Sequence, residues 1–286
     1  MTPVFFHIPK CAGTYVIKQQ LSLIHAYRKK KQIENKDLII TSEPGRNIEI
    51  MKGNQVLVRI IALDIKNICL SNHKFEISKS DITNFKINFE EINIETFNEV
   101  EIISVTIKSA GFRYWKNILK KIGINSSKKW TIIRDPFEVA RSLYFYLNSS
   151  DSFHELTHGL INYNTFEDYL KSYSLSDSWL IRNILNLSDD KGLTDEDYLM
   201  TLEELKDFEI FNNNQVDFAI DKIFKECHNI SINDINISNS KSNTSNHTGV
   251  KLEDLDEETQ KLFLEKTKYD RKLYDYFSNR EIIYRI

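Results

Sequence analysis

The sequence lacks the features that mark several large classes of protein. Its three cysteines, Cys11, Cys69 and Cys227, lie far apart among 286 residues, which argues against a disulfide framework or a zinc ribbon. It has no apolar run long enough to span a bilayer, and no secretory signal pattern follows Met1. A net charge of −3 provides no bulk positive charge for nucleic acid. We therefore expect a reduced, soluble, cytoplasmic protein that binds neither nucleic acid nor membrane.

Strand and helix patterns alternate in the first part of the chain, and helical patterns dominate after residue 150. The apolar periodicity predicts strands at 4–8, 37–41, 100–107, 129–133 and 230–237, with a hairpin within 47–64. It predicts helices at 13–28, 112–122, 164–172, 176–187, 194–206, 214–228 and 255–277, and one that begins at 136. This order predicts an α/β fold with a central parallel sheet flanked by helices and a mostly helical C-terminal half, in a single domain over 1–286.

The sequence FFHIPKCAGTY, at residues 5–15, joins the first predicted strand to the first predicted helix. The first turn of a helix presents backbone N–H groups and the positive end of the helix dipole, which together suit a phosphate. Gly13 allows close approach of the backbone, Thr14 adds a hydroxyl and Lys10 adds a full positive charge. An ordinary P-loop has its lysine directly after a glycine, and the chain contains neither a Gly-Lys pair nor G-x-G-x-x-G. The motif therefore predicts a phosphate site unlike that of an ordinary ATPase or Rossmann protein.

HIPKCAGT resembles the H-I-P-K-T-G-G-T signature of sulfotransferases that use 3′-phosphoadenosine 5′-phosphosulfate (PAPS). In that family the signature binds the 5′-phosphosulfate, and the fold is P-loop-like. Cys11 and Ala12 depart mildly from the signature, and Tyr15 stands where a serine is often found. The resemblance implies that the phosphosulfate is bound by Lys10, Cys11, Ala12, Gly13, Thr14 and Tyr15.

IIRDPFEVARSLYFY, at residues 132–146, is similar to the second signature of the same family, R-D-P-x-x-x-x-x-S. The resemblance implies that Arg134 and Ser142 hold the 3′-phosphate of the nucleotide. Helical geometry places Ser142 about two turns into the helix on the side of Arg134, and a guanidinium fork suits phosphate oxygens. Arg141 has no assigned role in this pattern.

Two further segments are similar to parts of the family. Lys108, in VTIKSAGF, resembles the lysine of a K-[ST]-x motif in heparan-type members and would help screen the sulfuryl oxygens. Lys241 and Asn243 belong to a loop before the last helix, similar to the loop that covers the nucleotide in the family. Ranges 68–100, a possible insertion, and 150–210, a helical region expected on the acceptor side, match no motif.

The resemblance implies transfer of a sulfuryl group from PAPS to a hydroxyl of a saccharide or polar small molecule, with an amine acceptor also open. Lys10 and the helix N–H groups would stabilise charge on the departing 5′-phosphate oxygen, so no metal is expected. Glu43 is the predicted general base, although it also fits an ordinary turn residue beside Pro44. Three other residues are alternative bases: His154, Glu155 and His158. Aromatic side chains that could line the acceptor pocket, or belong to the core, are Tyr114, Trp115 and Tyr146.

Three other functions remain open. Residues 154–158, HELTH, fit the H-E-x-x-H pattern of zinc peptidases, with Glu167 as a distant third ligand, but a polar segment precedes them. A P-loop kinase-like protein would depend on ATP and Mg²⁺. A binding protein without turnover would bind adenosine 3′,5′-bisphosphate and transfer nothing.

Overall fold

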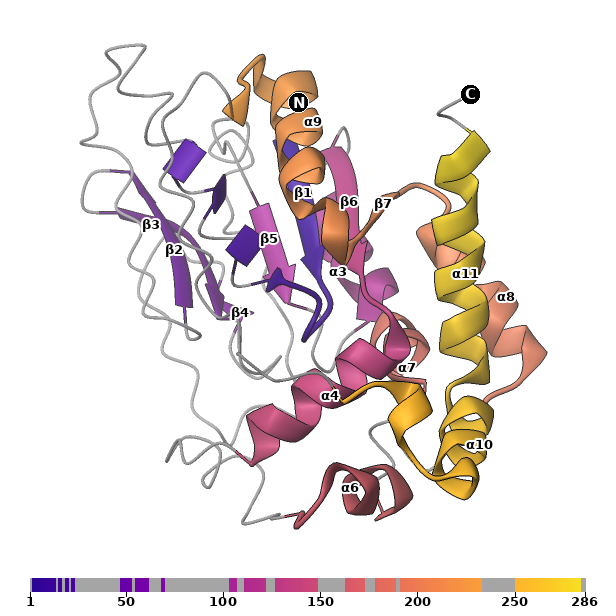
Figure 1. Cartoon of the computed structure of the whole chain (residues 1–286). Coiled ribbons are helices and arrows are strands. Elements are labelled where there is room, and N and C mark those ends of the chain that lie inside the picture. The colour runs from indigo at the N-terminus through magenta and orange to yellow at the C-terminus, as the bar shows by residue number, and fades with distance from the viewer. Residues whose placement is uncertain are drawn as a thin grey trace.

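The computed structural model describes residues 2–13, 15–16, 19–20, 22–23, 47–52, 55–61, 68–69, 103–106, 111–121, 127–148, 163–172, 178–188, 191–232 and 250–283. A four-stranded sheet lies at its centre, with strand order β5-β1-β6-β7 and every neighbouring pair parallel (Figure 1). Its strands are β1 (Thr2–His7), β5 (Ile103–Thr106), β6 (Ser127–Ile133) and β7 (Glu209–Asn212). A second, antiparallel sheet contains β2 (Asn47–Lys52), β3 (Gln55–Ile61) and β4 (Ile68–Cys69).

Helices make up most of the described chain after β6. They are α3 (Gly111–Lys121), α4 (Pro136–Leu147), α6 (Phe166–Ser172), α7 (Trp179–Leu185), α8 (Asp195–Leu205), α9 (Val216–His228), α10 (Glu257–Lys266) and α11 (Lys268–Ile283). Single 3₁₀ turns are η6 (Asn213–Gln215) and η8 (Leu252–Asp254). The described residues at 13, 15–16, 19–20 and 22–23 are also helical. Within the described residues, no helix is both long and apolar enough to cross a membrane.

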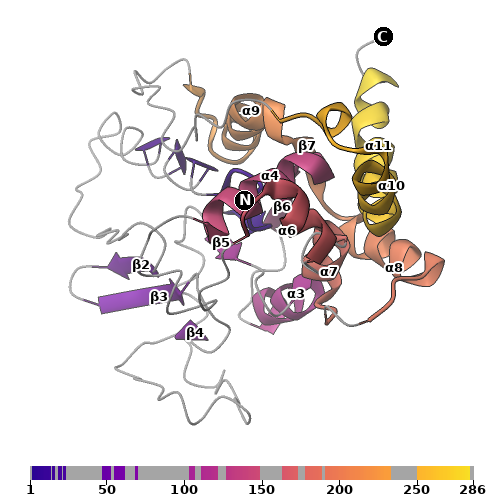
Figure 2. The same ribbon diagram turned by 60° about the horizontal axis from the view of Figure 1, so that its bottom comes forward.

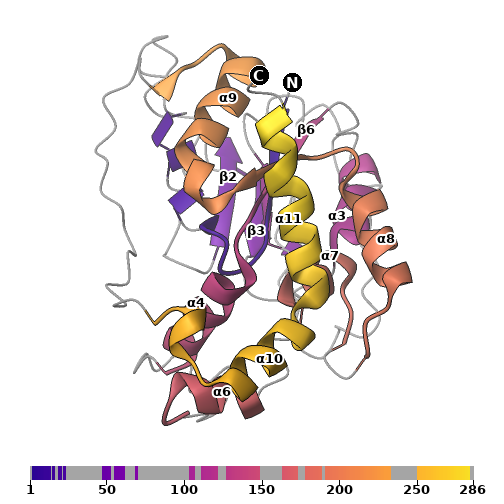
Figure 3. The same ribbon diagram turned by 45° about the vertical axis from the view of Figure 1, so that its right-hand side comes forward.

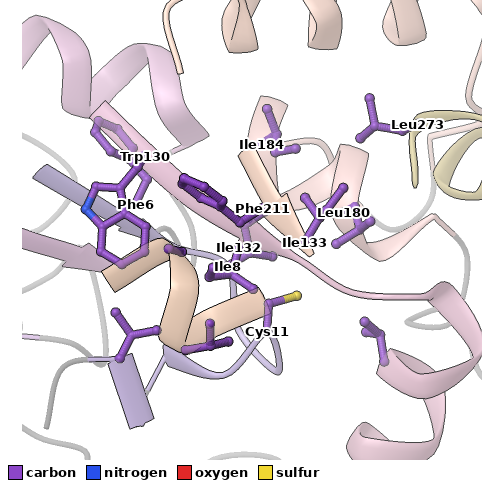
Figure 4. Packing of buried hydrophobic residues seen from close by; sticks show 14 of the residues in the cluster. Phe6, Ile8, Cys11, Trp130, Ile132, Ile133, Leu180, Ile184, Phe211 and Leu273 are labelled. Atoms are coloured by element: carbon purple, nitrogen blue, oxygen red, sulfur yellow. The ribbon is translucent and has the colours of Figure 1, made fainter. Parts of the chain in front are cut away.

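Consecutive side chains of a strand point to opposite faces of the sheet, and both faces of this sheet are buried. Phe5 packs against Trp130, with ring centroids 4.6 Å apart, and Trp130 continues through Phe211 toward α9. Phe6 instead packs against Phe112 of α3, with ring centroids 4.9 Å apart. Figure 2 shows α9 and α3 on opposite sides of the sheet, and Figure 4 shows Phe6, Trp130 and Phe211 among the buried side chains of the core. Packing on both faces explains why the residues at 4–6 in β1 and at 130–133 in β6 are buried at every position rather than at alternate ones.

The C-terminal helices close one side of the molecule. Helix α11 runs beside β7 and contacts α4, α7 and α8 (Figure 3). Asp270, in its first turn, is buried and accepts hydrogen bonds from the backbone N–H groups of Leu180 (2.7 Å) and Ile181 (3.0 Å). One carboxylate of α11 therefore fixes the beginning of α7.

The predicted α/β fold with a central parallel sheet is confirmed, but the predicted helix at 255–277 divides into α10 and α11. At Thr267 the backbone leaves helical geometry (φ −101°, ψ 11°), and its buried hydroxyl donates to the Phe263 carbonyl. Strand β7 is an addition that the sequence did not predict. Residues 230–232 are not in a strand, and the rest of the strand predicted there, like the one at 37–41, lies outside the described residues.

Candidate functional site

The segment after β1 forms a tight turn of unusual backbone geometry. The Ile8 carbonyl accepts a hydrogen bond from the Cys11 N–H at 3.1 Å, with Pro9 and Lys10 between them. Lys10 has φ 69°, as the third residue of a type II turn requires, and Ala12 has φ 60°. The Cys11 N–H is used in closing the turn, and the helix that begins at Gly13 directly afterwards presents the N–H groups of its first turn. The turn therefore leads directly into a helix N-terminus, a position that can bind an anion.

Gly13 begins the helix that follows this turn, and it is needed for space. The Val16 N–H donates to the Ala12 carbonyl at 3.0 Å, which starts the helix. A Cβ atom on Gly13 would lie 1.9 Å from the His7 ring. Burial, followed by the nearby Lys10 charge, lowers the pKa of His7 to about 4, so its ring is neutral at pH 7. The neutral imidazole of His7 therefore occupies the space beside Gly13.

The residues around Arg134 join β6 to α4 by a capped helix start. The Asp135 carboxylate accepts from the N–H groups of Phe137 (2.9 Å) and Glu138 (3.2 Å), and Pro136 occupies the first helical position. Helix capping thus accounts for Asp135 and Pro136. Capping does not account for Arg134, whose side chain lies at the C-terminal edge of the sheet, where ligands of open α/β sheets bind.

The two predicted phosphate-binding segments meet at this edge. Arg134 Nη1 donates to the Lys10 carbonyl at 3.2 Å, because β1 and β6 are adjacent parallel strands that end side by side. The Lys10 ammonium lies 3.0 Å from the centre of the Tyr146 ring on α4, a close cation–π contact. Arg134 Nη2 pairs with Glu138, also on α4, at 3.1 Å. Figure 1 shows α4 passing this edge of the sheet.

One side of α4 lies against both the Lys10 and the Arg134 segments. Glu138, Ser142 and Tyr146 follow one another at intervals of four residues, so they lie along one side of the helix. The contacts of Lys10 with Tyr146 and of Arg134 with Glu138 place the two cations against this same side. Ser142, half-buried, lies between them along the helix. The predicted convergence of Lys10, Arg134 and Ser142 is therefore compatible with the geometry of α4.

Cys11 and Tyr15 have contacts that the sequence did not indicate. Cys11 is fully buried in the core (Figure 4), and burial raises the pKa of its thiol to about 12, so the thiol stays protonated at neutral pH. The Tyr15 hydroxyl donates to Asp217 at the start of α9 at 2.7 Å. Burial and this hydrogen bond raise the pKa of Tyr15 to about 12. Cys11 thus packs the inner side of the turn, and Tyr15 ties the first helix to α9.

Two residues without a sequence signal support the turn. Trp179 donates its indole N–H to the Pro9 carbonyl at 3.1 Å. Asp270 in turn holds α7, which begins at Trp179, through its hydrogen bonds to Leu180 and Ile181. These contacts join positions about 90 to 170 residues apart in the chain, and no local pattern marks them.

The structure places only part of the predicted site. The predicted residues outside the described ranges are Thr14, Glu43, Lys108, Lys241 and Asn243, together with the alternative bases His154, Glu155 and His158. Tyr114 and Trp115 lie within α3. Among the described residues, no group of three or more His, Cys, Asp or Glu side chains could hold a metal ion.

No protein-family model matches the chain, and no curated protein matches its sequence.

Proposed function

We propose that this protein is a PAPS-dependent sulfotransferase with the P-loop-like fold of that family. The observation that carries the proposal is the hydrogen bond from Arg134 to the Lys10 carbonyl, with both side chains directed to one face of α4. A nucleotide with phosphates at its 3′ and 5′ positions needs two anion sites that open onto one space. Arg134 and Ser142 would bind the 3′-phosphate, and the turn at residues 10–14 would bind the 5′-phosphosulfate.

The backbone and Arg134 supply further support for an anion. A helix begins directly after the turn, and the N–H groups of its first turn suit an anion. Arg134 Nε is buried and has no hydrogen-bond partner among the described residues, so it is a donor that a phosphate oxygen would satisfy. A buried guanidinium donor beside a helix N-terminus suits a phosphate group better than a neutral ligand.

The proposed reaction is an in-line displacement at sulfur. The acceptor oxygen forms a bond to sulfur and passes its proton to a general base, for which we propose Glu43. The bond between sulfur and the bridging oxygen breaks, and that oxygen leaves with the electron pair on the 5′-phosphate. Lys10 and the helix N–H groups would stabilise this developing charge, and Lys108 would screen the sulfuryl oxygens.

The acceptor is proposed to be a hydroxyl of a saccharide or a polar small molecule. Tyr146 would form part of the wall of the acceptor pocket near the transferred group, because its ring lies against the Lys10 ammonium. An aromatic face beside a cation can stack on a ring of the acceptor while the cation binds the transferred anion.

The experiment is a PAPS turnover assay on the full chain with a panel of hydroxyl and amine acceptors, in buffer with EDTA. We expect release of adenosine 3′,5′-bisphosphate that depends on an acceptor and is unaffected by EDTA. Lys10→Ala should abolish transfer with an unchanged circular dichroism spectrum. Lys206→Ala is the matched control, because Lys206 is an exposed lysine paired with Glu203 on α8.

Arg134→Ala should weaken nucleotide binding more than it lowers turnover at saturating PAPS. Arg113→Ala is its control, since Arg113 is mostly exposed and pairs with Glu204 away from the turn. Unchanged PAPS affinity in Arg134→Ala would remove the second anion site from the proposal. Phosphoryl transfer from ATP that requires Mg²⁺ would replace the proposal with a kinase-like function.

A further inference from the structure

Arg141, which the sequence pattern left without a role, lies midway along α4 in a small charged group with Glu138 and Arg134. Its Nη2 atom is 2.6 Å from Glu138 Oε2, and Arg134 Nη2 is 3.1 Å from the same oxygen. Arg141 Nη1 donates to the Val250 carbonyl at 3.1 Å. Two guanidinium groups therefore converge on one oxygen of one carboxylate.

The charge of this group is unbalanced in a way that favours a further anion. Two arginines and one glutamate carry a net charge of +1, and the side chains of Arg134 and Arg141 are only 22% and 20% exposed. Cations this far from bulk water attract an anion more strongly than surface lysines do. A phosphate monoester carries about −1.5 to −2 at pH 7, and guanidinium forks match its oxygens.

We propose that Arg141 joins Arg134 and Ser142 as a third residue at the 3′-phosphate and strengthens the preference for nucleotides that carry one, and that Glu138 competes with that phosphate for the two guanidiniums. This inference rests on the proposed function, because it assigns a residue and a competitor to the same site. On binding, phosphate oxygens would take the place of Glu138 Oε2 between Arg134 and Arg141. The Val250 carbonyl would keep the Arg141 fork in position.

The test compares two ligands, because a merely structural role for Arg141 would affect them equally. Isothermal titration of the full chain measures the affinity for adenosine 3′,5′-bisphosphate and for adenosine 5′-monophosphate, and the ratio of the two reports recognition of the 3′-phosphate. In Arg141→Ala we expect this ratio to fall about tenfold or more, as loss of a charged hydrogen bond predicts. Arg141→Lys should recover part of the ratio, because it restores the charge without the fork.

Glu138→Gln tests the competitor. It removes the negative charge and keeps the size of the side chain, so we expect it to raise affinity for adenosine 3′,5′-bisphosphate roughly threefold to tenfold, with little change for the 5′-monophosphate. Glu203→Gln, an exposed glutamate of α8 paired with Lys206, is the matched control and should change neither affinity.

The outcomes separate this inference from the proposed function. If the wild-type chain prefers the bisphosphate and Arg141→Ala keeps the full ratio, Arg141 is only a structural contact and the inference is wrong while the function stands. Equal losses for both ligands in Arg141→Ala overturn it in the same way. Lower bisphosphate affinity in Glu138→Gln overturns the role of Glu138 as competitor. If the wild-type chain binds neither nucleotide, both proposals fall together.

Discussion

Replacing Gly13 with alanine should destabilise the fold, because a methyl group there would lie 1.9 Å from the His7 ring. The ring cannot move toward Phe5, because the two rings stack with their centroids 6.0 Å apart and Phe5 is fully buried. Overpacking of this kind costs about 1–3 kcal/mol of unfolding free energy. The backbone conformation itself adds no cost, because Gly13 is not at positive φ.

The assay is urea unfolding of the wild type, Gly13→Ala, His7→Ala and the double variant, analysed as a double-mutant cycle. In the His7→Ala background the new methyl group has room, so we expect Gly13→Ala to cost less than about 0.5 kcal/mol there, with a coupling energy of about 1–3 kcal/mol. Gly192→Ala is the control, because nothing lies within 4 Å of its added Cβ, and it should be neutral or stabilising by about 0.4–1 kcal/mol. Additive effects of the two substitutions would refute the packing of His7 against Gly13.

Three further predictions follow from the same contacts. Folding lowers the pKa of His7 from 6.5 to about 4, so the unfolded state binds more protons between these pH values. The free energy of unfolding should therefore fall as the pH drops from 6.5 to 4. His7→Gln should flatten this part of a plot of urea midpoint against pH, and an unchanged plot would contradict the prediction. Tyr146→Leu should lower the PAPS turnover number several-fold, whereas Tyr146→Phe should stay near wild type, because Lys10 contacts the ring. An equal loss of turnover in both variants would implicate the hydroxyl instead. Asp270→Ala should lower the unfolding free energy by about 2–4 kcal/mol, because two buried N–H groups lose their acceptor. Asp270→Asn should lower it less. A loss below about 1 kcal/mol for Asp270→Ala in urea unfolding would count against the role of Asp270 at the start of α7.

Much of the fold was predictable, because strong apolar periodicity marks its elements. The strand predicted at 129–133 corresponds to β6, and the helix predicted from residue 136 corresponds to α4, whose start is marked by Asp135 and Pro136. Strand β7 has only four residues between two helices, too short for alternation to reveal. The break at Thr267 depends on a local hydroxyl bond inside a continuous helical pattern, so periodicity alone could not show it.

The meeting of the Lys10 and Arg134 segments was expected from the resemblance alone, which implies that both bind one nucleotide. Arg134 contacts the Lys10 carbonyl because β1 and β6 are adjacent parallel strands, an adjacency that the sequence did not predict. The supporting residues were not predictable, because Trp179 and Asp270 reach the turn through contacts distant in the chain. The fit of His7 against Gly13 was also missed, since a glycine in a phosphate loop is ordinarily explained by the ligand.

We propose that the turn at Lys10 and the segment at Arg134 together bind a nucleotide with phosphates at both the 3′ and 5′ positions. Isothermal titration of the full chain with adenosine 3′,5′-bisphosphate in EDTA tests it most directly. We predict saturable binding of one nucleotide per chain, weaker in Lys10→Ala and in Arg134→Ala and lost in the double variant. The absence of binding, or binding of equal strength in the double variant, would contradict the account.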